Sequence, residues 1–197
     1  MRVISGIYKR RNLKAVPGNN TRPTTDKNKE NMFNIIGPYF DGGNVLDLFA
    51  GSGGLGIEAI SRGMDYLYAV DQNYQAFQTV KDNLDSLGIG TDKAKVYKMS
   101  CFKALDKFIE DKIKFDLVLL DPPYGKGFVP KVLKILLENH MLNNQAIVVC
   151  EEVNVGASLR VLRNVLSRIT LGANTVFEGD IPLGMGIIEK IAHLWQP

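Results

Sequence analysis

Short apolar runs and longer amphipathic stretches alternate along the middle of the chain, and this alternation predicts the fold class. The expected strands cover residues 44–49, 66–71, 95–99, 116–120 and 146–150. Apolar residues recur at helical spacing between them, and the expected helices cover residues 54–62, 74–87, 102–109 and 128–139. Strands of about five residues separated by helices of about ten are typical of βαβ units around a buried parallel sheet. We therefore predict a doubly wound α/β domain with a mostly parallel sheet.

The two ends of the chain depart from this alternation. Residues 1–25 mix short β-prone pieces with basic and turn residues, and they predict a small hairpin, called here the arm. Asp26 is placed to cap a helix that carries Met32, Phe33 and Ile36 on one face. We assign residues 26–197 to the α/β domain. Its last part, residues 153–197, has helical spacing in two pieces, one of them containing Ile187 and Ile188.

The composition restricts the chemistry. The 197 residues suit one domain, and 45% apolar with 23% charged side chains exclude a disordered chain. Cys101 and Cys150 are too few for a zinc site or a disulfide framework, and His140 and His193 lack metal-ligand or triad spacing, so no metal is expected. No apolar run approaches the roughly 18 residues of a membrane span, and the start lacks the apolar core of a signal peptide. These features predict a cytoplasmic protein.

Positive charge is concentrated at the N-terminus. Residues 1–31 carry eight Lys or Arg side chains and only two carboxylates, whereas the remaining residues carry 16 against 19. A basic arm on a mildly acidic body indicates a polyanionic partner that binds at the N-terminus.

A glycine-rich turn follows the first expected strand, where doubly wound sheets bind their ligands. Gly51, Gly53 and Gly56 match the GxGxxG spacing of nicotinamide dinucleotide-binding turns. Asp47 precedes them at the strand end, and no basic residue follows to hold phosphates. The carboxylate suits a cationic ligand better than a pyrophosphate. Asp71 ends the second strand and is placed to accept hydrogen bonds from ribose hydroxyls, which both a dinucleotide and S-adenosylmethionine (SAM) require.

The segment Asp121-Pro122-Pro123-Tyr124 follows the fourth expected strand. Two prolines end the strand and leave a rigid rim of acceptors, the Asp121 carboxylate and the Pro122 carbonyl. A tyrosine ring beside them completes a site for a planar base with an exocyclic amine, whose protons meet the acceptors while the ring stacks.

These motifs carry a family resemblance. DLFAGSGGLG with DPPY resembles the class I SAM-dependent amino-methyltransferases. The segments MRVISGIYKRRNLK, TRPTTDKNKENMFNI and DPPYGKG are similar to bacterial methyltransferases that modify the N2 amine of a guanine in small-subunit (16S) ribosomal RNA. The resemblance extends over residues 1–152. It implies a Rossmann-like fold, SAM as cofactor without a metal, and small-subunit RNA or a partly assembled small subunit as partner of a monomer.

The resemblance also implies roles for individual residues. The catalytic segment would be Asp121, Pro122, Pro123 and Tyr124. Cofactor-binding residues would be Asp47, Phe49, Ala50, Gly51, Ser52, Gly53, Asp71, Gln72, Ser100, Cys101 and Thr24. RNA-binding residues would be Arg10, Arg11, Lys14, Arg22 and Thr25.

The sequence departs from the family pattern at two places. Ser100-Cys101 stands where the family has an acid beside the adenine, and a serine hydroxyl accepts a hydrogen bond more weakly than a carboxylate. Residues 153–197 also lack the Tyr-Gly-x-Thr signature of an antiparallel strand pair.

Four other functions remain open. DPPY also suits a DNA methyltransferase acting on adenine N6 or cytosine N4, although this chain has little room for a target-recognition segment. A methylase of glutamine side chains is also conceivable, but those enzymes have Asn before Pro-Pro where this chain has Asp121. An oxidoreductase explains only the glycine spacing. A catalytically weak RNA-binding module of the same fold would account for Ser100 and the unusual tail.

Overall fold

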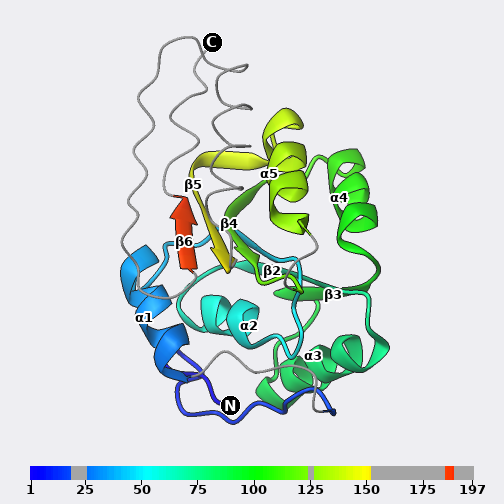
Figure 1. Cartoon of the computed structure of the whole chain (residues 1–197). Helices are drawn as coiled ribbons and strands as arrows, with labels where there is room; N and C mark the ends of the chain where they lie inside the picture. Colours follow the sequence, from blue (N-terminus) through cyan, green and yellow to red (C-terminus); the bar gives the residue numbers. More distant parts are fainter. Residues whose placement is uncertain (19–25, 124–126, 152–184, 189–197) are drawn as a thin grey trace. The chain divides into compact units, whose positions relative to one another are not determined.

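The computed structural model describes residues 1–18, 26–123, 127–151 and 185–188 (Figure 1). The chain divides into two compact units, residues 1–104 and residues 105–197. The predicted site residues Arg22, Thr24, Thr25 and Tyr124 lie outside the described residues, as does most of the tail.

The first unit alternates strands and helices along the chain (Figure 1). Its strands are β1 (Asn44–Asp47), β2 (Tyr66–Asp71) and β3 (Ala94–Lys98). Its helices are α1 (Asp26–Ile36), α2 (Gly54–Ser61) and α3 (Tyr74–Leu87), and α4 (Cys101–Glu110) begins in this unit. β1 pairs with β2 and β2 with β3, both in parallel.

The register brings the carboxyl ends of these strands to one edge. Asp47 of β1 lies opposite Ala69 of β2, and Asp71 at the end of β2 lies opposite Lys98 at the end of β3. The segments that follow the three strands therefore begin at the same edge of the sheet, where ligands of such sheets bind.

The second unit contains β4 (Phe115–Leu120), α5 (Phe128–Glu138), β5 (Leu142–Glu151) and β6 (Met185–Ile188). β4 and β5 are parallel, whereas β5 and β6 are antiparallel. The helix expected around Ile187 and Ile188 is therefore wrong, because both residues belong to strand β6. β-branched side chains favour strands, and the backbone of β5 provides the hydrogen-bond partners of β6. Spacing within the sequence does not reveal such a distant partner.

Buried apolar side chains account for the strands of both units. Val45, Leu46 and Leu67 are fully buried in the first unit, and Leu117 to Leu120 are buried in the second. The nearly continuous apolar runs of β1 and β4 are typical of parallel strands covered on both faces. The predicted α/β class with a mostly parallel sheet is thus confirmed. Among the described residues, no helix is both long and apolar enough to span a membrane.

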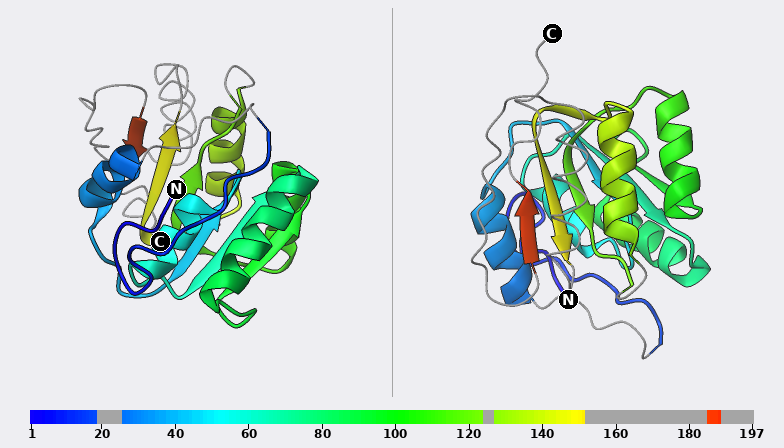
Figure 2. Two further views of the ribbon diagram at one scale, coloured as in Figure 1. Left: turned by 90° about the horizontal axis from the view of Figure 1, so that it is seen from below. Right: turned by 45° about the horizontal axis from the view of Figure 1, so that its top comes forward.

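The described part of the arm, residues 1–18, is a short hairpin packed on α2 and α3 (Figure 2). The amide of Val3 donates to the Arg11 carbonyl at 2.9 Å, and the amide of Arg10 donates to the Val3 carbonyl at 2.9 Å. A single antiparallel bridge joins Arg2 to Asn12. Residues 1–18 thus form a hairpin with one bridge in place of two full strands, and residues 19–25 of the predicted arm lie outside the described residues.

Candidate functional site

The glycine loop, residues 48–53, joins β1 to α2 through a tight turn. The amide of Gly53 donates to the Ala50 carbonyl at 2.7 Å. Gly51 and Gly53 have φ angles of 54° and 79°, in the left-handed region that side chains disfavour. These two glycines therefore set the path of the loop.

Asp71 fastens the glycine loop to the end of β2. One carboxylate oxygen, Oδ2, accepts the amide of Gly51 at 3.0 Å, and Oδ1 accepts the amide of Asn73 at 2.8 Å. The Asn73 side chain in turn caps α3. The structure thus brings together Gly51 and Asp71, which sequence reasoning placed in one site. The carboxylate also organises the loop, a role that the sequence did not indicate.

Asp47 is buried, with 2% of its surface exposed, and holds the first turn of α2. Its Oδ2 accepts the amide of Gly56 at 3.0 Å. A Cβ on Gly56 would lie 3.1 Å from that same oxygen and 2.6 Å from Leu67 Cδ1. Gly56 therefore permits the close approach of helix and strand that this bond requires.

The space beside Gly51 differs from the space beside the other two glycines. A Cβ built on Gly53 would contact Val80 at 3.1 Å, and one on Gly56 would overlap Leu67. On Gly51 it would meet no atom within 4 Å. The backbone at Gly51 is thus open to a ligand, whereas Gly53 and Gly56 are required for packing.

Ser100 and Cys101 follow β3 at the same sheet edge. The amide of Met99 donates to the Asp71 carbonyl at 3.2 Å, which holds this segment beside the end of β2. The Ser100 hydroxyl accepts the amide of Lys103 at 3.4 Å and so caps α4. Burial raises the pKa of the Cys101 thiol, so this group is protonated at neutral pH and is a poor nucleophile.

Asp121, Pro122 and Pro123 follow the fully buried end of β4 in the second unit. Pro122 is buried, Asp121 is half-buried and Pro123 is exposed. The prolines end the strand as predicted. Within the ranges that the structure describes, no group of three His, Cys, Asp or Glu side chains could hold a metal ion.

Comparison with known proteins places this geometry in a family. The model of a family described as "Conserved hypothetical protein 95" matches residues 1–172. The Bacillus subtilis protein named "Putative rRNA methyltransferase YlbH" is 51% identical over 151 residues, which cover 77% of this chain and 82% of the relative. "Ribosomal RNA small subunit methyltransferase D" of Haemophilus influenzae is 33% identical, over 77% of this chain and 78% of the relative. The chain belongs to the small-subunit rRNA methyltransferase D family.

A solved structure agrees with the membership in the methyltransferase D family. "Putative methyltransferase yhhF from Escherichia coli" superposes with a TM-score of 0.76 and 28% identity, covering 98% of each chain. The predicted Rossmann-like, doubly wound methyltransferase fold is confirmed. The chain is a methyltransferase of this family.

In this member of the methyltransferase D family, the basic residues of the arm fall into two groups. Arg11 donates through Nη2 to the Ser86 carbonyl at 2.7 Å, and Lys14 Nζ lies 3.1 Å from a carboxylate oxygen of Asp82, so both are tied to α3. Hydrogen bonds from Gln78 and Lys14 lower the pKa of Asp82. Arg10 instead lines an open cavity of about 500 Å³. The cavity is lined by Arg2, Val3, Ile4, Ser5, Lys9, Arg10, Asp26, Lys27 and Glu30.

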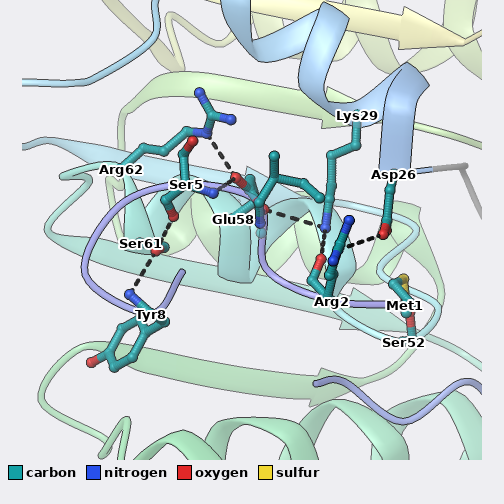
Figure 3. Close-up of polar contacts among 12 residues, drawn as sticks. Met1, Arg2, Ser5, Tyr8, Asp26, Lys29, Ser52, Glu58, Ser61 and Arg62 are labelled. Atoms are coloured by element: carbon teal, nitrogen blue, oxygen red, sulfur yellow. Dashed lines mark hydrogen bonds and ion pairs between the residues drawn. The ribbon is translucent and has the colours of Figure 1, made fainter. Parts of the chain in front are cut away.

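Glu58 in the middle of α2 anchors the arm, and sequence reasoning missed it (Figure 3). Its carboxylate accepts the amides of Ile4 at 2.8 Å and Ser5 at 2.9 Å. The same carboxylate lies 3.3 Å from Lys29 Nζ and 2.8 Å from Arg62 Nε. A charge within the apolar run Ile57–Ile60 was the signal in the sequence.

Lys29 is one of the eight cationic side chains of residues 1–31, but it does not face a partner. Its side chain is 1% exposed, and its ammonium donates to the Arg2 carbonyl at 2.7 Å (Figure 3). Burial lowers the pKa of Lys29, and the carboxylate of Glu58 opposes that shift. Lys29 belongs to the internal charge cluster with Glu58 and Arg62, and the cavity-lining cations Arg10, Lys9 and Lys27 are the better candidates for a polyanion.

Proposed function

We propose that this chain transfers the methyl group of SAM to the exocyclic N2 amine of a guanine in small-subunit ribosomal RNA. The observation that carries the proposal is the glycine loop, bonded through Gly51 to Asp71 and open beside Gly51, in a chain of the methyltransferase D family. The names of the relatives support an rRNA substrate, and the DPPY segment supports an exocyclic amine as the acceptor.

The residues at the sheet edge fit a SAM molecule. Each oxygen of the Asp71 carboxylate has a second lone pair beyond the amides it already accepts, and these would receive the ribose hydroxyls. The open backbone at Gly51 would admit the methionine part. Ser100 would accept the adenine amine while its hydroxyl also caps α4. When bound, SAM supplies an electrophilic methyl group on a sulfonium.

The segment that follows β4 would prepare the guanine. Its N2 lone pair is delocalised into the ring, so the free amine is a poor nucleophile. Hydrogen bonds from the two amine protons to the Asp121 carboxylate and the Pro122 carbonyl would favour a pyramidal nitrogen whose lone pair points outward. The guanine must be unpaired or flipped, which costs a few kcal/mol, and stacking on Tyr124 returns about 1–3 kcal/mol. Asp121 or water would take the amine proton as the methyl group passes from the sulfonium sulfur to the nitrogen.

The arm would bind the RNA backbone. Arg10, Lys9 and Lys27, which line the open cavity, would meet phosphates at the surface. Arg11 and Lys14 are weaker candidates for phosphate contacts, because each already binds a residue of α3. Because counterions are released when cations meet phosphates, binding should weaken steeply as salt is added.

The test of the proposed function is methyl transfer from radiolabelled SAM to unmodified small-subunit RNA, naked and in partly assembled subunits. Mass spectrometry of the digested RNA identifies the base and the methylated atom. Binding of NADH in place of SAM, or label found only in duplex DNA, would contradict the proposal. Binding of SAM and RNA without transfer would favour the RNA-binding module.

Replacing Asp71 with Asn is expected to weaken SAM binding by about 10- to 100-fold, because hydrogen bonds to a charged acceptor are each worth about 1.5–3 kcal/mol. Calorimetric titration measures the change. Asn73→Ala is the matched control: it removes the cap of α3 beside Asp71 and should cost about 1 kcal/mol of stability with SAM affinity unchanged. Equal loss of affinity in both variants would contradict a direct role for Asp71.

Alanine at Gly51 should chiefly lower SAM affinity, and alanine at Gly56 should chiefly lower stability. Gly51→Ala places a methyl group in the open space, so SAM affinity should fall at least tenfold while stability changes by about 1 kcal/mol. Gly56→Ala overlaps Leu67 and should lower the free energy of unfolding by about 1–3 kcal/mol. Titration with SAM and urea unfolding measure the two quantities. Unchanged SAM affinity in Gly51→Ala would show that no ligand approaches this backbone.

A further inference from the structure

Asn83 is a polar residue at a core position of α3. It lies on the same helical face as Val80, Leu84 and Leu87, and only 1% of its surface is exposed. A buried amide at such a position requires hydrogen-bond partners, and those partners come from two segments far away in the sequence.

The Asn83 side chain joins the arm to the glycine loop. Its Oδ1 accepts the amide of Lys14 at 2.8 Å, and its Nδ2 donates to the Lys14 carbonyl at 3.0 Å. The same Nδ2 donates to the Ser52 carbonyl at 2.8 Å. Both N–H donors and the oxygen of the amide are thus used. Two of the three bonds hold the arm, and one holds the loop.

A second contact connects the same two segments. The Met1 sulfur lies 3.7 Å from Ser52 Oγ, and a Cβ on Gly54 would be 2.9 Å from that sulfur (Figure 3). The amide of Leu13 donates to the Met1 carbonyl at 3.0 Å, which ties the Met1 end of the hairpin to the segment that reaches Asn83. The arm is therefore connected to Ser52 in two ways, directly through Met1 and indirectly through the side chain of Asn83.

We propose that Asn83 is a positioning residue that couples RNA binding by the arm to cofactor binding by the glycine loop. The inference rests on the proposed function, because it takes the arm as the RNA contact and the loop as the cofactor contact. The glycines on either side of Ser52 give the loop backbone freedom. The bond from Asn83 fixes the Ser52 carbonyl while the arm is bound to Asn83. RNA that keeps the arm bound to Asn83 raises the population of the loop conformer that binds the cofactor.

Reciprocity makes the proposal measurable. If RNA tightens cofactor binding by some factor, the cofactor must tighten RNA binding by the same factor. We expect a factor of about fivefold or more in the wild-type protein, the lower end of typical couplings. Asn83→Ala cuts the three bonds and leaves the 3.7 Å contact of Met1 with Ser52, so the factor should fall toward one.

The experiment titrates S-adenosylhomocysteine, which cannot react, into the protein with and without saturating small-subunit RNA transcribed in vitro. Wild type, Asn83→Ala, Asn83→Asp and Asp82→Ala are compared. Asn83→Asp keeps the acceptor for the Lys14 amide and loses the donor to the carbonyls of Ser52 and Lys14, so it should also lose the coupling. Asp82→Ala is the matched control, because it removes the neighbouring ion pair with Lys14 and leaves the bonds of Asn83 in place.

Hydrogen exchange gives a readout that needs no cofactor. In the protein alone, the amides of Gly51 and Gly53 should exchange faster in Asn83→Ala than in wild type, and Asp82→Ala should match wild type. A purely structural role would lower the thermal stability of Asn83→Ala and leave both the coupling factor and the loop exchange unchanged.

Each outcome decides the proposal. Coupling in wild type and in Asp82→Ala that is lost in both Asn83 variants would support it. A wild-type factor of one, or equal coupling in wild type and folded Asn83→Asp, would overturn it even if Asn83→Ala fails to fold. If the wild-type protein binds no S-adenosylhomocysteine at all, the proposed function itself fails. If it methylates RNA but shows no coupling, the proposed function stands and only the role of Asn83 fails.

Discussion

Replacing Asp121 with Ala is expected to lower kcat/KM for RNA methylation by about 10²- to 10⁴-fold, the usual contribution of a positioned group that accepts a proton. The carboxylate would hold one proton of the guanine amine and take it up after transfer. Without it, the nitrogen lone pair stays delocalised in the ring. SAM affinity should be unchanged, because Asp71 and the glycine loop hold the cofactor in this proposal. Methylation kinetics and calorimetric titration measure the two effects separately.

Two variants test whether the loss at Asp121 is chemical. Asp121→Asn creates the Asn-Pro-Pro-Tyr pattern of glutamine methylases and keeps one acceptor oxygen, so it should retain more activity than Asp121→Ala. Asp116→Asn changes a carboxylate near the start of β4, the strand that precedes Asp121, and should leave methylation unchanged. Its Oδ1 accepts a hydrogen bond from Asn143 at 2.9 Å. Full activity in Asp121→Ala would refute the catalytic assignment, and RNA binding should persist in all three variants.

The predicted strands and helices were found where the hydrophobic period was strong. α3 was predicted at residues 74–87 and β2 at residues 66–71, with the bounds that the structure has. α3 is amphipathic and capped at both ends, by Asn73 and by Gly88, so local signals define its limits. β5 begins at Leu142, before the expected residue 146, because polar residues at its start hide a strand that pairs with β4 through an irregular register.

The candidate site was predictable to the extent that it consists of glycines and strand ends. The turn at Gly51 and the carboxylate of Asp71 follow from the rule that ligands bind at the carboxyl ends of parallel strands. The anchors of the arm were not predictable in the same way. Sequence separations of 53 residues between Ser5 and Glu58, and 69 between Lys14 and Asn83, leave no local pattern.

The missed residues nevertheless share one sequence feature. Asn83 precedes Leu84 and follows Val80 by three positions, so it occupies the apolar face of α3. Lys29 lies three and four positions before Met32 and Phe33, on the buried face of α1, and Glu58 lies within the apolar run of α2. A polar side chain within an apolar helical face must find partners when it is buried. All three side chains bind the arm, so interruptions of the apolar face mark where the arm packs.

Replacing Glu58 with Gln is expected to lower the free energy of unfolding by about 3–5 kcal/mol, the cost of leaving buried charges without their partner. Lys29 and Arg62 are each 1% exposed, and Glu58 is the carboxylate within ion-pair distance of both. The other contacts of the Arg62 guanidinium are uncharged: Nη1 donates to the Pro38 carbonyl at 3.0 Å, and Cζ lies 4.8 Å from the centroid of the Phe33 ring. Nη2 is buried without a hydrogen-bond partner among the described residues. Urea unfolding followed by circular dichroism measures the change.

Asp111→Asn is the control for Glu58→Gln, because it removes one carboxylate of an exposed pair with Lys107 and should cost about 0–1 kcal/mol. A triple variant separates charge from arm attachment. Lys29→Met, Glu58→Leu and Arg62→Met together remove every buried charge of the cluster and should recover most of the stability. The amides of Ile4 and Ser5 would still lack their acceptor, so the arm should exchange hydrogen rapidly and RNA should bind more weakly. A loss below 1 kcal/mol in Glu58→Gln would mean that water or backbone groups, rather than Glu58, stabilise the two cations.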